Sequence, residues 1–244
     1  MNKMVKKYKI SLIINIVILV LVTLACISMF IGFKFMPDKT LLETTKMETF
    51  KFFTVDSNII MGMASLILII YDIKYIKGKI KDIPNIIYIL KFISTSAITL
   101  TFITTAFFLA PQYGFYAMYN NNNLFFHLII PVLSIVSYVF FEGHISKYRH
   151  ALLGKIPMLL YSIYYTSMIF FHINNGEIDY NYDFYGFLQG DINNAFTVIP
   201  VIYLFSYIIA FILLLLNNKI KLANLDYCID SEYALWMCKR DKQC

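Results

Sequence analysis

Residues 10–33 of the chain read ISLIINIVILVLVTLACISMFIGF and contain no charged side chain. A membrane-spanning helix needs about 20 consecutive, mostly apolar residues to cross roughly 30 Å of hydrocarbon. The apolar core of a signal peptide is shorter, at about 7–15 residues. This stretch therefore predicts a helix that crosses a membrane and remains in the chain as an anchor.

Five further apolar runs follow the first one, and the composition of the whole chain agrees with them. Hydrophobic residues make up 59% of the chain and charged residues only 15%, whereas soluble domains carry about 25% charged residues. We therefore predict an all-α polytopic membrane protein in which residues 1–221 form one domain and residues 222–244 a tail. The six expected spans are residues 10–33, 52–73, 86–109, 124–141, 156–173 and 196–216.

The distribution of lysine and arginine predicts the topology. Basic residues gather before the first span, in the loops at 74–85 and 142–155, and after the last span, whereas the loops at 111–123 and 174–195 contain none. Cytoplasmic loops carry the excess of Lys and Arg, so both termini are expected in the cytoplasm. The remaining outer loop, residues 34–51, has mixed charge and room for a short interfacial helix. Lys91 lies close enough to the inner end of its span for its ammonium group to reach the interface.

The net charge of +6 is explained by these short loops, so we expect no nucleic-acid partner. The third span is rich in hydroxyl groups, which either let helices approach closely or line a polar cavity. These side chains are Ser94, Thr95, Ser96, Thr99, Thr101, Thr104 and Thr105.

A polar patch opens the second span, where residues 51–60 read KFFTVDSNII. Thr54 is the third residue of that span and His127 is the fourth residue of the fourth span, which runs in the same direction. At a rise of 1.5 Å per residue, both lie roughly 5 Å below the outer boundary. The sequence therefore places a hydroxyl and an imidazole at one depth, without showing whether they face each other.

A threonine hydroxyl beside a neutral imidazole allows nucleophilic acyl transfer, because the imidazole can remove the hydroxyl proton. Asn58, one turn below Thr54, is a candidate donor to the developing oxyanion. Asp56, Ser57 and Asp183 are candidate supporting or substrate-lining residues. Simpler interpretations remain open: Thr54 as a helix cap or back-bonded residue, and His127 as an interfacial filler.

Metal binding is a weaker alternative for the same end of the chain. An open zinc site could draw on His127 and His172 together with acidic residues of the last outer loop, namely Glu177, Asp179 and Asp183. No helical spacing of histidines fixes such a geometry, so we expect no metal and no other cofactor. The four cysteines, Cys26, Cys228, Cys238 and Cys244, match no paired-cysteine motif and are interpreted as incidental thiols.

Four short motifs resemble those of a known group of membrane proteins. They are Phe-Phe-Thr54-Val-Asp-Ser-Asn58, Phe-Phe-His127-Leu-Ile-Ile-Pro131, Pro157-Met-Leu-Leu-Tyr161 and Tyr180-Asn-Tyr-Asp-Phe-Tyr185-Gly186. In order and spacing they resemble a bacterial group of six-span proteins that is similar to the androgen-induced, ADTRP-like integral membrane hydrolases of animals. The resemblance covers about residues 10–216 and implies a multi-pass protein of the bacterial cell membrane.

In the animal hydrolases a threonine and a histidine cleave fatty acid esters of hydroxy fatty acids, so the resemblance implies these roles for Thr54 and His127. We therefore expect a hydrolase of lipid-like esters, with a membrane lipid or fatty-acyl ester as its substrate and a lipid-facing cavity open to the outer leaflet. Two alternatives remain open. One is an acyltransferase with the same pair, and the other is a non-enzymatic protein that binds lipid or a partner. The second alternative predicts that the two side chains point apart or pack against backbone carbonyls. A transporter is disfavoured because the sequence shows no repeat and no pair of broken helices.

Overall fold

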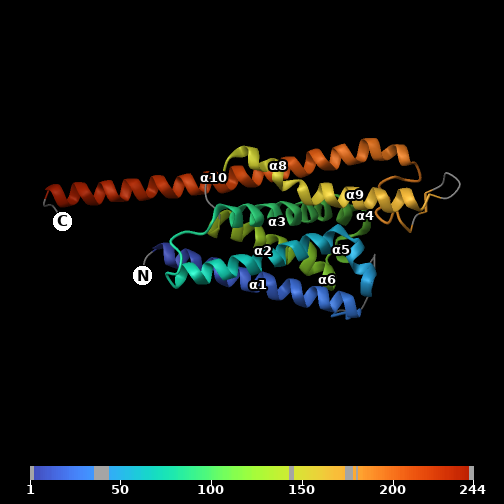
Figure 1. Cartoon of the computed structure of the whole chain (residues 1–244), viewed down its shortest axis with the longest axis horizontal. Coiled ribbons are helices and arrows are strands. Elements are labelled where there is room, and N and C mark those ends of the chain that lie inside the picture. The colour runs from blue at the N-terminus through green and yellow to red at the C-terminus, as the bar shows by residue number, and fades with distance from the viewer. Residues whose placement is uncertain (1–2, 36–43, 143–145, 174–177, 180, 242–244) are drawn as a thin grey trace.

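The computed structural model describes residues 3–35, 44–142, 146–173, 178–179 and 181–241, and this part of the chain contains helices and no strand. Long helices lie side by side as an elongated bundle (Figure 1). The longest are α1 (Lys3–Ile31), α2 (Phe53–Ile76), α3 (Asn85–Thr104) and α10 (Ala195–Asp241). The expected all-α class is confirmed.

Five of the six expected spans are long and apolar enough to cross a membrane. These segments are Val5–Ile31, Phe53–Ile76, Asn85–Tyr113, Asn122–Phe141 and Ile192–Ala223. The remaining expected span forms α9 (Ile156–Phe171), whose 16 residues extend only about 24 Å. That length is less than the roughly 30 Å of a bilayer core.

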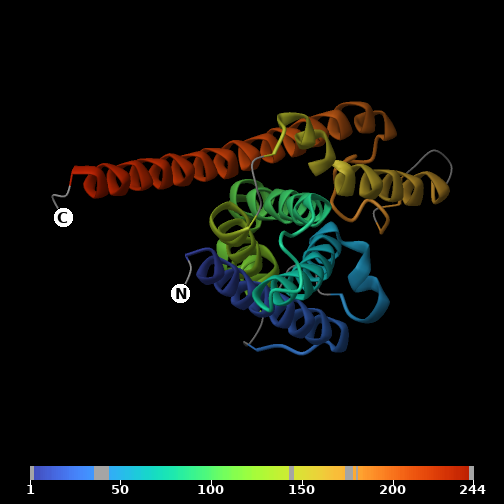
Figure 2. The same ribbon diagram turned by 60° about the vertical axis from the view of Figure 1, so that its left-hand side comes forward.

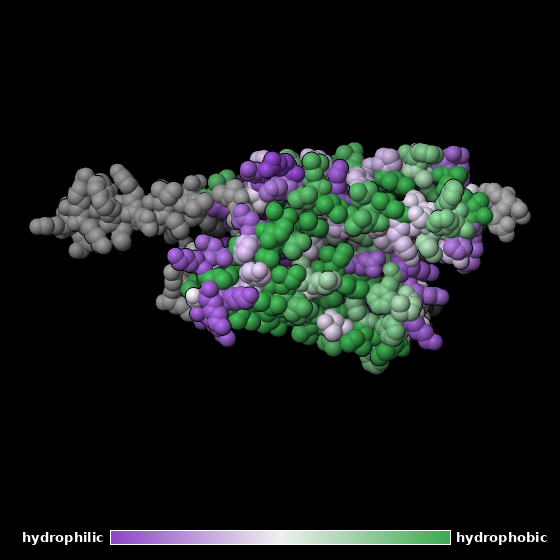
Figure 3. Space-filling model, in the orientation of Figure 1, coloured by the Kyte–Doolittle hydropathy of each residue, from purple (hydrophilic) through white to green (hydrophobic). Residues whose placement is uncertain are grey.

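The outer surface of the bundle agrees with a membrane environment. Large apolar side chains point outward along its length, among them Leu24 (58% exposed), Met63 (61%) and Phe107 (70%). Figure 3 shows a broad hydrophobic band across the middle of this face, with hydrophilic residues gathered mainly toward its two ends. A surface that is apolar in the middle and polar at both ends is the pattern that a lipid bilayer requires.

Both ends of the chain lie at the same end of the bundle, and α10 continues past the other helices there (Figures 1 and 2). Residues 222–241, predicted as a tail, therefore prolong the last helix without a break. At the opposite end, η1 (Lys46–Lys51) supplies a short 3-10 helix in the loop where one was expected. Residues 36–43 of that loop lie outside the described residues.

Two of the spans widen into π-helical turns just before a proline. In the third span η2 (Thr105–Leu109) precedes Pro111, and in the fourth span η3 (Phe125–Ile129) precedes Pro131. A proline ring has no N–H to donate and collides with the carbonyl four residues earlier in a regular α-helix. The wider turn removes that collision, which explains why both π-turns end where they do.

Short elements complete these spans and the loops between them. They are α4 (Ala110–Tyr113), α5 (Phe115–Met118), α6 (Asn122–Leu124), α7 (Ile130–Val136), η4 (Ser137–Phe141) and η6 (Ile192–Asn194). The last turn of the fourth span, η4, is π-helical again, and there Glu142 N donates to Ser137 O across 3.0 Å. The carboxylate of Glu142 there contacts Asn15 of α1 and Lys91 of α3, as described below.

One face of α2 forms a buried polar stripe. Asn58, Ser65 and Asp72 follow one another at intervals of seven residues, and each is at most 1% exposed. Seven residues make about two turns of an α-helix, so the three side chains share one face. Polar side chains along the length of α2 therefore face the interior of the bundle.

Residues 148–154, predicted to lie in a loop at 142–155, form helical turns that lead into α9. The chain forms η5 (Tyr148–His150) and α8 (Ala151–Gly154), changes direction at Lys155 and continues as α9. A Cβ atom on Gly154 would lie 2.6 Å from Ala210 Cβ and 2.8 Å from Ser96 Oγ. Ser96 and Ala210 are each more than roughly 15 Å from the ends of their spans. The turn at Lys155 therefore lies near the middle of the bundle's length.

Gly154→Ala is expected to destabilise the bundle by about 1–3 kcal/mol, because the added methyl group forces α8 away from α3 and α10. Thermal unfolding of the purified protein in mild detergent measures the effect. The paired variant Gly154→Ala/Ala210→Gly removes the nearest colliding atom and should recover part of the loss. Equal stability of Gly154→Ala and wild type would show that α8 does not pack this closely.

Candidate functional site

A single amide joins the two segments that carry the predicted pair. Asn58 Nδ2 donates to Thr54 O at 2.7 Å and to Phe126 O at 3.3 Å, and Asn58 is fully buried. In the π-turn pattern the carbonyl of Phe126 would receive the N–H of residue 131, but Pro131 has none. The side chain of Asn58 supplies the missing donor, as neighbouring helices commonly do for prolines in membranes.

His127 is held in one tautomer by a backbone carbonyl. Its Nδ1 lies 2.8 Å from Met118 O, and the residue is 7% exposed. A carbonyl oxygen only accepts, so Nδ1 carries the hydrogen and Nε2 keeps its lone pair. Nε2 makes no hydrogen bond to any residue within the described ranges, which leaves it free to act as a base.

Thr54 is half-buried in the first turn of α2. Its carbonyl oxygen accepts from Asn58 and from Ser57 Oγ (3.0 Å), whereas its own hydroxyl makes no hydrogen bond within the part of the chain that the structure describes. No hydrogen bond joins this hydroxyl to His127 there. The structure brings the backbones of the two segments together, and among the described residues neither the Thr54 hydroxyl nor His127 Nε2 has a hydrogen-bond partner.

The three neighbouring polar residues have different surroundings. Asn58 gives both hydrogens of its amide to carbonyl oxygens, so binding an oxyanion would require it to release one of them. Ser57 Oγ lies 3.0 Å from Thr101 Oγ1 and ties α2 to α3. Asp56 is half-buried and makes no hydrogen bond to a described residue.

Tyrosines from the last outer loop and from α9 cover the start of α2. Phe53 N donates to the hydroxyl of Tyr185 at 3.0 Å, and Tyr161 donates its hydroxyl to Lys51 O at 2.7 Å. Burial raises the pKa of Tyr185 to about 12, so its hydroxyl stays neutral near pH 7. These two hydroxyls fix the end of α2 that carries Thr54, a role that the sequence did not reveal. Tyr180, in the same tyrosine motif, lies outside the described residues.

Asp183 shapes the loop that carries Tyr185. Its Oδ1 accepts the hydroxyl of Tyr165 and its Oδ2 accepts Leu188 N at 3.1 Å, while the residue is 2% exposed. Both carboxylate oxygens are thus used within the loop and α9. In this structure Asp183 supports the covering loop and does not contact Thr54 or His127 through a hydrogen bond.

Within the described residues, no group of three or more His, Cys, Asp or Glu side chains is arranged to hold a metal ion. His172 instead bonds through Nδ1 to Met168 O at 2.7 Å and stacks on Tyr182, with ring centroids 3.6 Å apart. Glu177 and Cys244 lie outside the described residues, and Cys26 is a free thiol.

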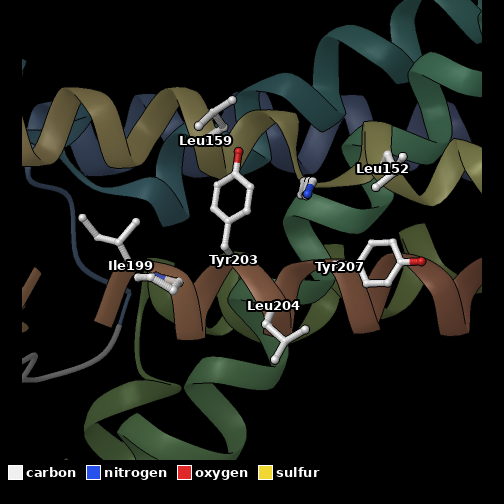
Figure 4. Close-up of a pocket in the computed structure, with 8 residues that line it drawn as sticks. Leu152, Leu159, Ile199, Tyr203, Leu204 and Tyr207 are labelled. Carbon is white, nitrogen blue, oxygen red and sulfur yellow. The ribbon is translucent and has the colours of Figure 1, made fainter. Parts of the chain in front are cut away.

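A shallow apolar groove of about 600 Å³, open to the outer surface, lies between α8, α9 and α10 (Figure 4). Its lining includes neither Thr54 nor His127. Next to Thr54, the start of α2 is covered by aromatic side chains. Phe52 packs against Phe184 and Tyr185, with ring centroids 5.2 and 5.9 Å apart.

The sequence did not reveal a buried ionic network that joins α1 and α3 to Glu142. Lys91 was expected to extend to the interface, but it is 0% exposed and points into the bundle. Its Nζ donates to Asn15 Oδ1 at 2.7 Å and to Ser65 Oγ at 3.0 Å, and lies 3.8 Å from Glu142 Oε2. The prediction was wrong because Lys91 lies on the buried face of α3.

The network extends through hydrogen bonds to a second carboxylate. Glu142 Oε1 accepts from Asn15 Nδ2 and from Ser137 Oγ. Ser11 Oγ donates to Asp72 Oδ2 at 2.7 Å, and Asn15 Nδ2 lies 3.4 Å from Ser11 Oγ. The signal in the sequence was the presence of charged residues within apolar runs. The network links α1, α2, α3 and the end of the fourth span.

The hydroxyl-rich third span is explained mainly by helix packing. Its hydroxyls donate to backbone carbonyls four residues earlier in the same helix, which satisfies them without a water-filled cavity. The residues that do so are Ser94, Thr95, Ser96, Thr99 and Thr101.

Comparisons of the chain with family models, with curated proteins and with solved structures find no match.

Proposed function

We propose that this protein is an intramembrane hydrolase of lipid-like esters, with Thr54 as the nucleophile and His127 as the general base. The tautomer of His127 is the observation that supports this function most strongly. Met118 O fixes the hydrogen on Nδ1, so the unprotonated Nε2 is the nitrogen left for the substrate side. Holding an imidazole through one nitrogen so that the other acts as base is the arrangement used in acyl transfer.

In the proposed reaction Thr54 Oγ1 attacks the ester carbonyl carbon while His127 Nε2 takes the hydroxyl proton. The tetrahedral intermediate expels the alcohol, which receives that proton from Nε2, and an acyl-threonine remains. Water then attacks the acyl group, Nε2 takes a proton from the water, and the proton returns to Thr54 as the fatty acid leaves. Thr54 and His127 must approach each other when substrate binds, a tightening that is common between free and occupied active sites.

The proposed membrane arrangement has six crossings and places this site at the outer side. Residues 148–171 form the fifth of these crossings in two pieces, η5 with α8 and then α9. Both termini lie at one end of the bundle (Figure 1), together with the basic loops, and we assign that end to the cytoplasm of a bacterial cell.

A non-enzymatic lipid-binding or partner-binding protein is the second candidate, and one observation favours it. That function predicts side chains packed against backbone carbonyls, and Nδ1 of His127 is packed in this way against Met118 O. Thr54 Oγ1 does not follow this pattern within the described residues. An acyltransferase would use the same steps with an alcohol in place of water.

Thr54→Ala is expected to lower ester hydrolysis by about a thousandfold or more, because no hydroxyl remains to form the acyl-enzyme. Release of free fatty acid from a fatty acid ester of a hydroxy fatty acid measures the reaction in detergent. Thr23→Ala is the matched control, since Thr23 is exposed on α1 and bonds its own helix at Leu19 O.

Turnover of that ester by the Thr54→Ala variant at the wild-type rate would exclude Thr54 as the nucleophile. Transfer of the acyl group to an added alcohol, with no free acid released, would identify the acyltransferase instead.

A further inference from the structure

Lys155 occupies an unusual position for a lysine in a membrane protein. It lies at the break between α8 and α9, with its Nζ 4.9 Å from the ring centroid of Tyr203 and 5.9 Å from that of Tyr207. Both tyrosines are more than roughly 15 Å from either end of the apolar segment Ile192–Ala223. The ammonium group of Lys155 therefore lies near the middle of the bundle's length, on its outer side, where Lys155 is half-buried and the neighbouring Leu159 and Leu204 are 40% and 61% exposed.

No carboxylate neutralises this cation. Among the described residues Lys155 forms no ion pair with Asp or Glu, and its contacts are the faces of the two tyrosine rings. A cation over aromatic rings gains about 0.5–2 kcal/mol, whereas a lysine at the centre of a membrane costs at least about 2.5 kcal/mol. Ionisable groups at this depth usually mark a binding site or an ion pathway, with a partner for the charge.

The groove beside Lys155 is open to the outer surface and offers an apolar bed for an alkyl chain. It has a volume of about 600 Å³ and lies between the broken fifth span and α10. Figure 4 shows Leu159 on one side, Ile199 and Leu204 on the other, and Tyr203 and Tyr207 projecting from α10. Apart from the ammonium group and two phenol hydroxyls, the lining side chains are hydrocarbon.

We propose that this open groove binds a long-chain fatty acid anion, with its carboxylate on Lys155 Nζ and its alkyl chain along α9 and α10. One cation matches the single charge of a carboxylate. A phospholipid fits less well, because its phosphate lies outside the roughly 30 Å hydrocarbon core whereas Lys155 lies near the middle of the bundle's length. The site consists of residues from α8, α9 and α10, so the proposal does not depend on Thr54 or His127.

A photoactivatable palmitate that carries a diazirine on its chain tests the site. The full-length protein is labelled in nanodiscs of phosphatidylcholine, and the labelled peptides are mapped by mass spectrometry. We expect adducts within residues 152–159 and 199–207. Lys155→Met should weaken palmitate binding by about tenfold to a hundredfold, the loss typical of a hydrogen bond to a charged group. Lys155→Arg keeps the cation and should largely retain binding.

Three further measurements separate the proposal from simple contact with lipid. Hexadecanol should compete at least about tenfold less well than palmitate, because it lacks the charge. Leu159→Trp, which fills the groove and leaves Lys155 in place, should also reduce labelling. Lys147→Met changes an exposed lysine of the preceding loop and should have no effect. Thermal unfolding of each variant shows that it is folded.

The proposal fails if labelling maps elsewhere, if hexadecanol competes equally, or if Lys155→Met labels as strongly as wild type. Competition by phosphatidylglycerol in the nanodisc as strong as that by palmitate would identify an anionic phospholipid as the occupant and would also overturn it. None of these outcomes depends on ester hydrolysis, so the result is separate from the test of the proposed function.

Discussion

Lys91→Met is expected to lower the free energy of unfolding by about 3–5 kcal/mol, the usual cost of removing one partner of a buried ion pair. The ammonium group of Lys91 is fully buried and contacts Asn15, Ser65 and Glu142. Methionine fills a similar volume but leaves the carboxylate of Glu142 buried without its counter-charge. Unfolding in mild detergent with increasing SDS, followed by circular dichroism, measures the change.

The double variant Lys91→Met/Glu142→Gln removes both charges and should recover much of the lost stability. Lys79→Met, at an exposed position in the basic loop after α2, should change stability by at most about 0.5 kcal/mol. If Lys91→Met costs under about 1 kcal/mol, the pair behaves like a solvated surface ion pair and the buried network is wrong.

His127→Ala is expected to lower kcat/KM for ester hydrolysis by about 10²–10⁴-fold, the usual contribution of a general base. His127→Asn separates this role from a structural one. The amide of asparagine can still donate to Met118 O, as Nδ1 does now, but it offers no base in place of Nε2. The asparagine variant should therefore unfold at nearly the wild-type temperature while losing as much activity as the alanine variant.

Retained hydrolysis in His127→Asn would show that the imidazole is a structural residue held by Met118 O. If both variants lose thermal stability together with activity, the imidazole is likewise a structural residue, because a purely structural role makes activity fall with folding. Neither result would affect the assignment of the buried ionic network.

The long helices could be predicted from apolar runs, because a bilayer imposes both the length and the composition of the segments that cross it. The length of the apolar run did not predict the structure of residues 148–171, which form η5, α8 and α9. The break at Lys155 depends on Gly154, which lacks a Cβ and fits against Ala210 and Ser96 from two other helices. Such a fit becomes visible only when the helices are packed together.

The depth of Thr54 and His127 could also be estimated from the sequence, because depth follows from the rise of a helix. The lateral arrangement could not. Asn58 contacts the carbonyl of Phe126, and Lys91 contacts Glu142, because each helix is rotated so that these side chains face one another. Hydrophobic periodicity does not specify that rotation when the outer surface of the bundle is as apolar as its core. The partners of polar groups in this bundle therefore had to come from the structure.

Labelling with a fluorophosphonate probe, followed by peptide mapping, tests the Thr54–His127 site most directly. The probe phosphonylates an activated hydroxyl and needs no knowledge of the natural ester. The proposed function predicts an adduct on Thr54 of the folded wild-type protein, and loss of labelling in Thr54→Ala, His127→Ala and His127→Asn. Labelling that survives Thr54→Ala, or wild-type protein that remains unlabelled, would contradict it.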